Sequence, residues 1–258
     1  RITSFTGETV EQLVEDALEK LMQKNKGPLS GLVLDLRNNP GGLLKVADAI
    51  NDMFLDANRY YENPIAELSK FKCNAATITI SMESRGRIDP NNKFCVGLTS
   101  DFIEGIPMVV LINAGSASAS EIVAKVLQVY GRATVVGTSN SFGKGTVQGT
   151  FKLATGDALL LTISQYLIGP EGCEQVLQTK GVTPDIFVTD PKEKLSPGDK
   201  ERVFEKKLPD AVIPSTISDA NCKYRYELPP GHKEAARDMV QKLGLIILDK
   251  NPETEEAR

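Results

Sequence analysis

The sequence is poor in the residues that most often build metal sites and histidine-dependent active sites. Its 258 residues include one histidine and four cysteines. The cysteines show no Cys-x-x-Cys or Cys/His ligand spacing, which argues against structural zinc, and we expect no metal and no cofactor. We interpret Cys73, Cys95, Cys173 and Cys222 as free buried thiols, with a Cys73–Cys95 pair left open for an exported chain.

Long apolar runs and an excess of positive charge are also missing. No run approaches the ~18–20 apolar residues of a membrane span, and no signal peptide is recognisable. The net charge of −4 gives no electrostatic reason to expect a nucleic acid partner. With 41% hydrophobic and 25% charged residues, the chain has the composition of a globular protein: one large domain, or one domain with an appendage. Because it begins abruptly at Arg1, we take it as a mature product or a piece of a longer precursor.

The most informative stretch is residues 107–148. The apolar run Met108–Ile112 predicts a buried strand, and residues 133–136 predict a second one. Between them lies a tract of small residues, 116–121, followed by apolar residues at helical spacing and by Gly131 at the expected C-cap position. The pattern predicts a strand–helix–strand unit with a tight corner at the small residues.

A serine at that corner would have the first helical N–H groups beside it. Those donors and the helix dipole can stabilise a developing oxyanion, which makes Ser118 a candidate nucleophile. The single histidine, His232, lies in a Pro-Pro-Gly-His turn near the C-terminus and gives a Ser-His-Asp triad little support. Lysine is the other base used with a serine nucleophile.

Lys144 is the candidate base because a glycine on each side lets backbone pack close around its stem. Burial would lower its pKa from about 10.4 towards the ~7–8 required of a base at neutral pH. If residues 144–148 are extended, Gln148 shares a face with Lys144 and could accept a hydrogen bond from the amine. The predicted catalytic residues are therefore Ser118, Lys144 and Gln148.

Each of these residues also has a simpler interpretation. Ser118-x-x-Glu121 matches a capping box, so Ser118 could serve only as an N-cap. Lys144 could be a solvated surface lysine, and Gln148 an ordinary strand residue. Residues 141–144 match the Ser-x-x-Lys of penicillin-binding enzymes, but that motif needs a helix, which the flanking glycines disfavour. Residues 137–144 resemble a phosphate-binding loop, but the spacing is one residue too long.

Four motifs together point to a known family. They are Ser-Ala-Ser-Ala-Ser-Glu at 116–121, Phe-Gly-Lys-Gly-Thr-Val-Gln at 142–148, Leu-Asp-Leu-Arg-Asn-Asn-Pro-Gly-Gly at 34–42 and Gly-Val-Thr-Pro-Asp-Ile at 181–186. The combination closely resembles the C-terminal processing, or tail-specific, serine peptidase family, over roughly residues 1–190. The resemblance implies that Ser118 is the nucleophile, Lys144 the base and Gln148 the residue that orients the base.

The resemblance also implies an oxyanion hole made of backbone. Its donors would be the N–H groups of Ala119 and Gly42, with Gly41, Gly143 and Gly145 in supporting positions. Two features depart from the family pattern. Val129 stands where an aspartate is common, which could alter the bonding of Arg132 nearby, and the loop 138–141 is one residue longer than expected.

The expected fold is α/β, a mainly parallel sheet with packed helices, similar to the ClpP/crotonase-like processing-peptidase core. We expect residues 1–190 to form this core, with a variable substrate-facing insert at 57–105, and residues 191–258 to form a C-terminal arm and helix. The expected local elements are helices at 10–25, 44–54 and 235–248 and strands at 31–36, 76–82 and 158–163. A capping box is expected at 9–12. A polar excursion is expected at 166–178, an arm with several prolines at 190–235 and a disordered tail at 252–258.

The implied function is a serine endopeptidase that cleaves proteins near their C-termini through an acyl-enzyme. Relatives usually carry a PDZ domain, which is not visible here. We therefore leave a PDZ domain, an adaptor or a homo-oligomer open as partners, and expect a periplasm, cell envelope or organelle lumen as compartment. The first alternative is a non-catalytic ligand- or protein-binding module on the same scaffold. The second, suggested only by Val129 and the longer loop, is a scaffold or inhibitor protein whose serine–lysine dyad is vestigial.

Overall fold

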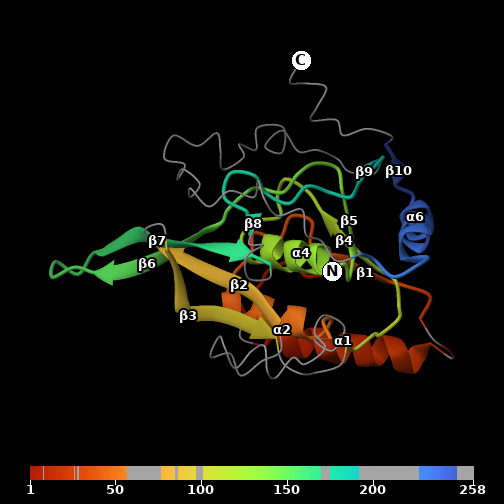
Figure 1. The fold of residues 1–258 in the computed structure, drawn as a ribbon, viewed down its shortest axis with the longest axis horizontal. Helices are drawn as coiled ribbons and strands as arrows, with labels where there is room; N and C mark the ends of the chain where they lie inside the picture. Colours follow the sequence, from red (N-terminus) through yellow and green to blue (C-terminus); the bar gives the residue numbers. More distant parts are fainter. Residues whose placement is uncertain are drawn as a thin grey trace, which may run out of the picture.

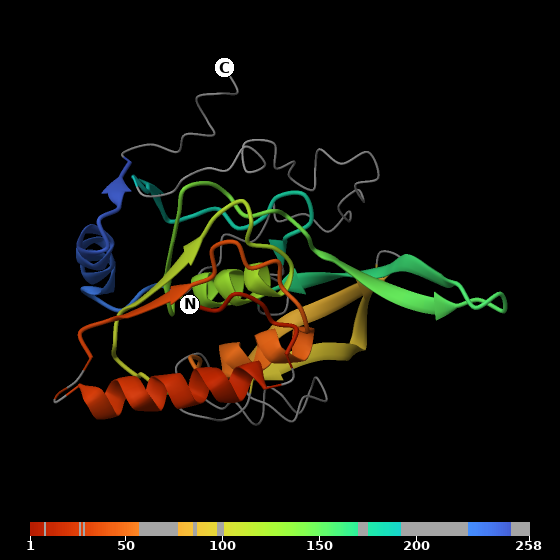
Figure 2. The same ribbon diagram turned by 180° about the vertical axis from the view of Figure 1, so that it is seen from behind.

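The computed structural model describes residues 1–7, 9–25, 27, 29–56, 77–84, 87–96, 101–169, 175–191 and 227–248. Of residues 77–84 and 87–96 it describes the backbone alone. Two sheets make up this part of the chain, one mainly parallel and one antiparallel. Helix α4, Ala119–Val129, contacts strands of both sheets and lies between them in the two opposite views (Figures 1 and 2).

The first sheet confirms the predicted α/β fold. Its strand order is β1-β4-β5-β9-β10. The first four strands run parallel: β1 (Leu32–Asp35), β4 (Met108–Ile112), β5 (Thr134–Gly137) and β9 (Ile186–Thr189). The short strand β10, Ile246–Ile247, pairs antiparallel with β9. The predicted strand–helix–strand unit of residues 107–148 is thus β4, α4 and β5, with Gly131 at φ 58° directly after the helix, as its C-cap role requires.

Both faces of this sheet are covered, which is why β4 is apolar at every position. Alternate side chains of a strand point to opposite faces. Met108, Val110 and Ile112 belong to the larger core cluster with α2 and α4, while Val109 and Leu111 belong to a second cluster with residues of α6. All five residues are buried. The core therefore fixes the register of β4 and with it the start of the loop that follows.

Helix α1, Val10–Lys24, and helix α2, Leu44–Asp52, occur where the sequence predicts them. The capping box expected at 9–12 is wrong, because the Thr9 side chain makes no capping hydrogen bond. The apolar stripe of α1 is also narrower than predicted. Leu18 is buried and Val14 packs against the core, whereas Leu13 is 63% exposed.

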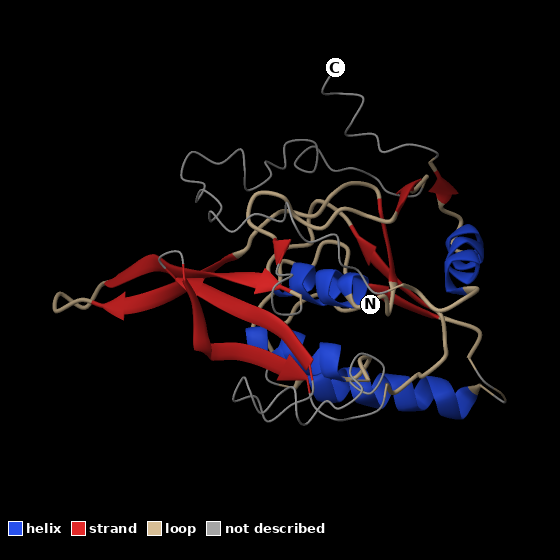
Figure 3. Cartoon of the chain, viewed as in Figure 1, coloured by secondary structure: helices blue, strands red, loops and turns tan. Residues whose placement is uncertain are grey.

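The second sheet is antiparallel, with strand order β3-β2-β7-β6 and β8 paired to β7 (Figure 3). Its strands are β2 (Thr77–Ser84), β3 (Arg87–Val96), β6 (Thr146–Lys152), β7 (Ala158–Ile168) and β8 (Gln175–Val176). The predicted strand at 76–82 is confirmed as β2. No separate pattern predicted β3, because its stretch contains proline, two asparagines and several charges.

Two expectations about β7 are wrong. Residues 158–163, predicted to be a core strand, are exposed, because this part of β7 pairs with β6 in a hairpin that projects beyond the body (Figure 1). Conversely, Tyr166, Leu167 and Ile168, expected in a polar excursion, end the same strand and are buried. An apolar run predicts a strand, but whether it is buried depends on the neighbours that tertiary structure supplies.

The C-terminal region returns to the first sheet. Helix α6, His232–Lys242, is shorter than the predicted helix at 235–248, because Gly244 adopts φ 76° and β10 follows. Ala236 and Val240 pack against the sheet. At the other end of the chain, the Ile2 N–H donates to Asp35 O and the Phe5 N–H to Gly41 O, so residues 2–5 run beside β1 and the loop after it.

The loop before β4 is fixed by a buried ion pair. Arg132, which is 2% exposed, pairs with Asp101 and donates to the carbonyl oxygens of Ile103 and Ile106. Because Val129 stands where an aspartate is common, the sequence analysis expected that the bonding of Arg132 could be altered. In the structure, Asp101 is the acidic partner of Arg132. Among the described residues, no helix is both long enough and apolar enough to cross a membrane.

Several predictions fall on residues that the structure does not describe. The proline-containing arm lies mostly there, as do the C-terminal tail, most of the insert at 57–105 and Cys73, Cys173 and Cys222. Only the backbone of Cys95 is described. The division into a core at 1–190 and an arm at 191–258 stays a prediction.

Candidate active site

The predicted site lies where β1 and β4 end, because two neighbouring parallel strands bring the loops that follow them to one edge of the sheet. The two loops are bonded to each other. The carbonyl oxygen of Asn39 accepts from the Ala117 N–H at 3.0 Å and from the Ser120 hydroxyl at 2.9 Å. The Asn113 side chain accepts from the Asn38 N–H at 2.9 Å. The Asn-Asn-Pro-Gly-Gly turn and the small-residue tract therefore form one unit.

Ser118 lies at the corner of this unit, as the N-cap of α4, with φ 56° and ψ −118°. Positive φ is uncommon for a residue with a side chain, and residues strained in this way cluster at functional sites. Gly41, with φ 96°, packs directly against it. A methyl group at Gly41 would lie 2.6 Å from Ala117 O and 2.8 Å from both the Ala119 N and the Ser118 Cβ. A side chain at position 41 would therefore displace the corner.

The two predicted oxyanion donors have no hydrogen-bond partner among the described residues. The N–H of Ala119 is the first of α4 and precedes the intrahelical bonds. The neighbouring Gly41 N–H donates to Asn39 Oδ1 at 2.9 Å and is occupied, whereas the Gly42 N–H makes no such bond in the described residues. Gly42 packs against the Phe5 backbone, where an added methyl group would lie 2.3 Å from the Phe5 carbonyl carbon.

Glu121 joins Ser118 to the segment that carries Lys144. One carboxylate oxygen, Oε2, accepts from the N–H groups of Ser118 and Lys144, both at 2.8 Å. The other, Oε1, accepts from the Gly143 N–H at 2.7 Å and from the Ser141 hydroxyl at 2.5 Å. The sequence predicted Glu121 only as half of a capping box, whereas the structure shows a carboxylate that four donors surround.

The Glu121 carboxylate is fully buried. Burial raises its pKa from 4.5 to about 7, against the opposing effect of the Ser141 hydroxyl and the N–H groups of Gly143, Lys144 and Ser118. Near neutral pH the group therefore lies close to its titration midpoint. Protonation of Glu121 would turn one of its acceptor oxygens into a donor, whereas its four hydrogen-bond partners are all donors.

The main chain of Lys144 is also held from its other side. The Tyr166 hydroxyl donates to Lys144 O, and Gln178 Oε1 accepts from the Gly145 N–H at 2.7 Å. Both side chains are buried. A methyl group at Gly145 would lie 2.5 Å from the Gln178 N, which explains the glycine. Tyr166 and Gln178 were missed in the sequence, because nothing in their local pattern shows what they contact.

Hydrogen bonds to Glu121 link the main chains of Ser118 and Lys144, but the side chains of the three predicted catalytic residues are not linked in this way in the part of the chain described. Strand β6 begins at Thr146, so Lys144 lies before it, and the Lys144 side chain is half-buried. Gln148 is exposed and lies opposite Thr162, next to a register shift between Val147 and Gln148. Among the described residues, no hydrogen bond joins the side chains of Ser118, Lys144 and Gln148.

Ser141 is not available for the competing Ser-x-x-Lys interpretation. It is buried, its hydroxyl donates to Glu121, and its Oγ accepts from the Val182 N–H at 2.6 Å. Residues 141–145 are not helical, so the geometry required by that motif is missing. In the part of the chain that the structure describes, no group of three or more His, Cys, Asp or Glu residues could hold a metal ion.

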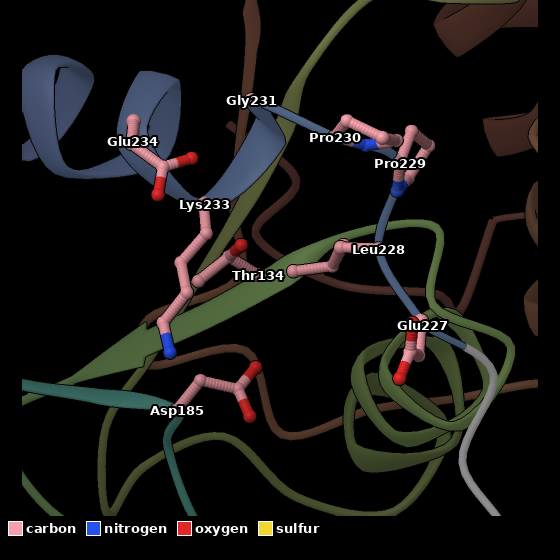
Figure 4. Close-up of a pocket in the computed structure, with 9 residues that line it drawn as sticks. All are labelled: Thr134, Asp185, Glu227, Leu228, Pro229, Pro230, Gly231, Lys233 and Glu234. Carbon is pink, nitrogen blue, oxygen red and sulfur yellow. The ribbon is translucent and has the colours of Figure 1, made fainter.

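A separate cavity of about 550 Å³ lies between the start of α6 and the edges of β5 and β9 (Figure 4). Its lining includes Thr134, Asp185 and residues 227–231, and none of the predicted site residues. The Lys233 side chain points towards Asp185 across the cavity. Because Asp185 already accepts hydrogen bonds from Gln128 and the Val135 N–H, its carboxylate has a structural role here.

Comparison with known proteins identifies relatives of this site and fold. The chain is 38% identical over 192 residues to a carboxy-terminal-processing protease of Bartonella bacilliformis, with 74% of this chain and 38% of that protein covered. It is 31% identical over 189 residues to the carboxyl-terminal-processing peptidase 3, chloroplastic, of Arabidopsis thaliana, with 73% and 31% covered. The chain thus spans about a third of the length of these relatives.

A solved structure, the photosystem II D1 C-terminal processing protease, superimposes with a TM-score of 0.58 at 26% identity, over 82% of this chain and 46% of that one. The family description Peptidase family S41 matches residues 1–188, which includes the Asn-Asn-Pro-Gly-Gly turn, the Ser118 corner and the Phe-Gly-Lys-Gly segment. The chain belongs to Peptidase family S41.

Proposed function

We propose that this chain is the catalytic core of a serine endopeptidase that cleaves protein substrates near their C-termini, with Ser118 as nucleophile and Lys144 as base. The observation that carries the proposal is the Glu121 carboxylate, which accepts from the main-chain N–H groups of both residues at 2.8 Å. Two residues 26 positions apart are thereby tied to one buried group. A structural capping box would need only the first of these bonds.

In the proposed mechanism, neutral Lys144 accepts the Ser118 proton as Ser118 Oγ attacks the scissile carbonyl carbon. The C–N bond of the tetrahedral intermediate then breaks, and Lys144 returns the proton to the leaving amine. Water, deprotonated by the same amine, attacks the acyl-enzyme and releases the new C-terminus. The Ala119 and Gly42 N–H groups are proposed to hold the oxyanion, which is consistent with their lack of other partners among the described residues.

The proposed role of Gln148, orienting the Lys144 amine, requires a change from the conformation described. Catalytic hydrogen bonds are often long without substrate and shorten in the Michaelis complex. We place this change in the side chains, because the Lys144 backbone is fixed by Glu121, Tyr166 and Gln178. Substrate binding would then align Lys144 and Gln148 with Ser118.

Mapping of the cleavage products tests this proposal. The protein should shorten an unfolded polypeptide, such as reduced and carboxymethylated α-lactalbumin, by cuts near its C-terminus, identified by mass spectrometry of the intact products over time. Blocking the C-terminal carboxylate as an amide serves as the control and should slow those cuts. If the correctly folded protein never shortens the substrate, the result would favour the non-catalytic binding module instead.

The compartment and partners are proposed from the relatives. One relative is named chloroplastic, and we propose an extracytoplasmic setting or an organelle lumen for this protein. A PDZ domain or adaptor that delivers substrate, and a homo-oligomer, remain proposals of the same kind. We propose no metal and no cofactor, since the mechanism runs on the serine and the lysine.

Tyr166 provides a test of the positioning of Lys144. Tyr166→Phe removes the hydroxyl that donates to Lys144 O and leaves the buried ring in place. We expect kcat to fall by about five-fold with KM little changed, because one neutral hydrogen bond contributes roughly 1 kcal/mol. Steady-state kinetics on a short peptide will separate kcat from KM, with Tyr130→Phe, at the C-cap of α4, as the matched substitution. An equal loss in both variants would contradict a role specific to Lys144.

A further inference from the structure

The hairpin of β6 and β7 carries an apolar face that nothing in the described structure covers. Phe151 lies opposite Leu159, and Gly149 lies opposite Leu161, so the side chains of these pairs point to one face. Ile163 joins them, because a methyl group at Gly149 would lie 3.3 Å from the Ile163 side chain. The four large side chains are each 43–47% exposed. We call this the apolar arm face: Phe151, Leu159, Leu161 and Ile163.

The opposite face of the same hairpin has a different character. Gln148 lies opposite Thr162, Thr150 opposite Leu160, and Lys152 opposite Ala158. Polar side chains alternate with apolar ones along β6, whereas on β7 this face carries Ala158 and Leu160 beside Thr162. Leu160, at 57% exposed, is the one large apolar side chain on this face.

The apolar arm face continues the core and starts beside the proposed catalytic residues. Val147, on the same face of β6, packs against the larger core cluster and lies three residues after Lys144. From there the face runs outward along the projecting hairpin, which extends from the body in both ribbon views (Figures 1 and 2). A chain bound along it would thus be led towards the Ser118 corner.

The size of the face identifies the kind of partner. Four half-exposed side chains present on the order of 300 Å² of apolar surface, and a patch of this size on a monomer is often functional. A stable dimer needs about 800 Å² from each partner, so a second copy of this chain would be held too weakly by this face alone. A few apolar side chains of an extended polypeptide match the area and the absence of charge.

We propose that the apolar arm face is an accessory binding surface for apolar segments of unfolded protein substrates. The inference rests on the proposed endopeptidase function and adds to it the class of substrate, namely unfolded chains with exposed aliphatic or aromatic side chains. Binding here holds the chain near Ser118 and contributes to KM for long substrates. Short peptides that span only the scissile bond do not reach it.

Adjacent leucines on opposite faces give a matched pair of variants. In a Ser118→Ala background, Leu161→Asn alters the apolar arm face and Leu160→Asn alters the other face at similar exposure. The probe is fluorescein-labelled, reduced and carboxymethylated α-lactalbumin, and the readout is fluorescence anisotropy. We expect Leu161→Asn to raise Kd about ten-fold, the effect of one buried aliphatic side chain, and Leu160→Asn to change it less than two-fold. Leu161→Met should bind like the parent.

The outcomes separate this inference from the proposed function, because binding is measured without hydrolysis. Equal effects of the two asparagine variants, or no binding by the parent, overturn the accessory surface and leave cleavage untouched. Sedimentation of the parent as a dimer and of Leu161→Asn as a monomer overturns the proposed occupant in favour of a second copy. Circular dichroism melting curves confirm that each variant is folded. If the Ser118→Ala parent binds the probe but the protein with Ser118 never cleaves it, the accessory surface is supported and the proposed endopeptidase function is contradicted.

Discussion

Ser118→Ala should abolish peptide hydrolysis, with kcat/KM falling by at least about 10⁴-fold. The substitution removes the proposed nucleophile and leaves the donors of Ala119 and Gly42 in place, so any residual rate reports backbone stabilisation alone. The fold should be kept, because the main-chain bond from Ser118 to Glu121 does not involve the hydroxyl. Cleavage of an unfolded substrate, followed by mass spectrometry, measures the loss.

Lys144→Met is the companion to this experiment. If serine and lysine act as a unit, the single variants and the double variant should lose the same activity, since a nucleophile without its base gains nothing further from the rest. Lys152→Met, on the projecting hairpin, is the matched control and should retain parental activity on a short peptide. Additive losses in the double variant, or a Ser118→Ala variant that cleaves like the parent, would contradict the mechanism.

Glu121→Gln should lower kcat about 100-fold and change its pH dependence. The amide keeps the shape of the carboxyl group but offers one acceptor oxygen and one NH₂ donor, so it cannot accept from Ser118, Ser141, Gly143 and Lys144 together. In the parent, the buried Glu121 carboxyl group loses its proton near pH 7. A rise of kcat/KM with pH through about pH 7 should therefore be present in the parent and missing in the variant.

The free energy of unfolding should fall as the pH rises from 4.5 to 7, whereas activity should rise over the same range. The unfolded carboxyl group has a pKa of 4.5 and the folded one a pKa of about 7, so the folded state retains a proton that the unfolded state has released between these values. The free energy of unfolding contributed by this group is full below pH 4.5 and falls by roughly 3 kcal/mol by pH 7 and above. Urea unfolding at pH 4.5 and pH 8 should show this decline in the parent and not in Glu121→Gln. Identical declines in both proteins would show that Glu121 is not the group responsible.

Much of the fold could be read from the sequence because local patterns and the structure agree. The all-apolar run at 108–112 is typical of a strand with both faces covered, and β4 is such a strand. The glycine at position 131 marks the end of α4, and the motif spacing fixed the two loops that meet beside Ser118. Local signals were right at these positions, although the capping box expected from the local pattern at 9–12 was wrong.

Contacts between distant segments could not be predicted in the same way. The run at 158–163 looks like a core strand, yet its position in the projecting hairpin depends on β6 and on the extent of the body. Glu121 was predicted from its local bond to Ser118, whereas its bonds to Ser141, Gly143 and Lys144 depend on a segment about 20 residues away. Tyr166 and Gln178 act on Lys144 from still further along the chain and gave no local signal.

Strand β10 covers one edge of the parallel sheet. Unpaired outer strands are templates on which other chains can add and aggregate. Strand β10 pairs antiparallel with β9, so the β9 edge of the parallel sheet is occupied by a strand of two residues. Removal of β10 would therefore expose the backbone of β9 as an unpaired edge on which other chains could add, before it affected the chemistry at Ser118.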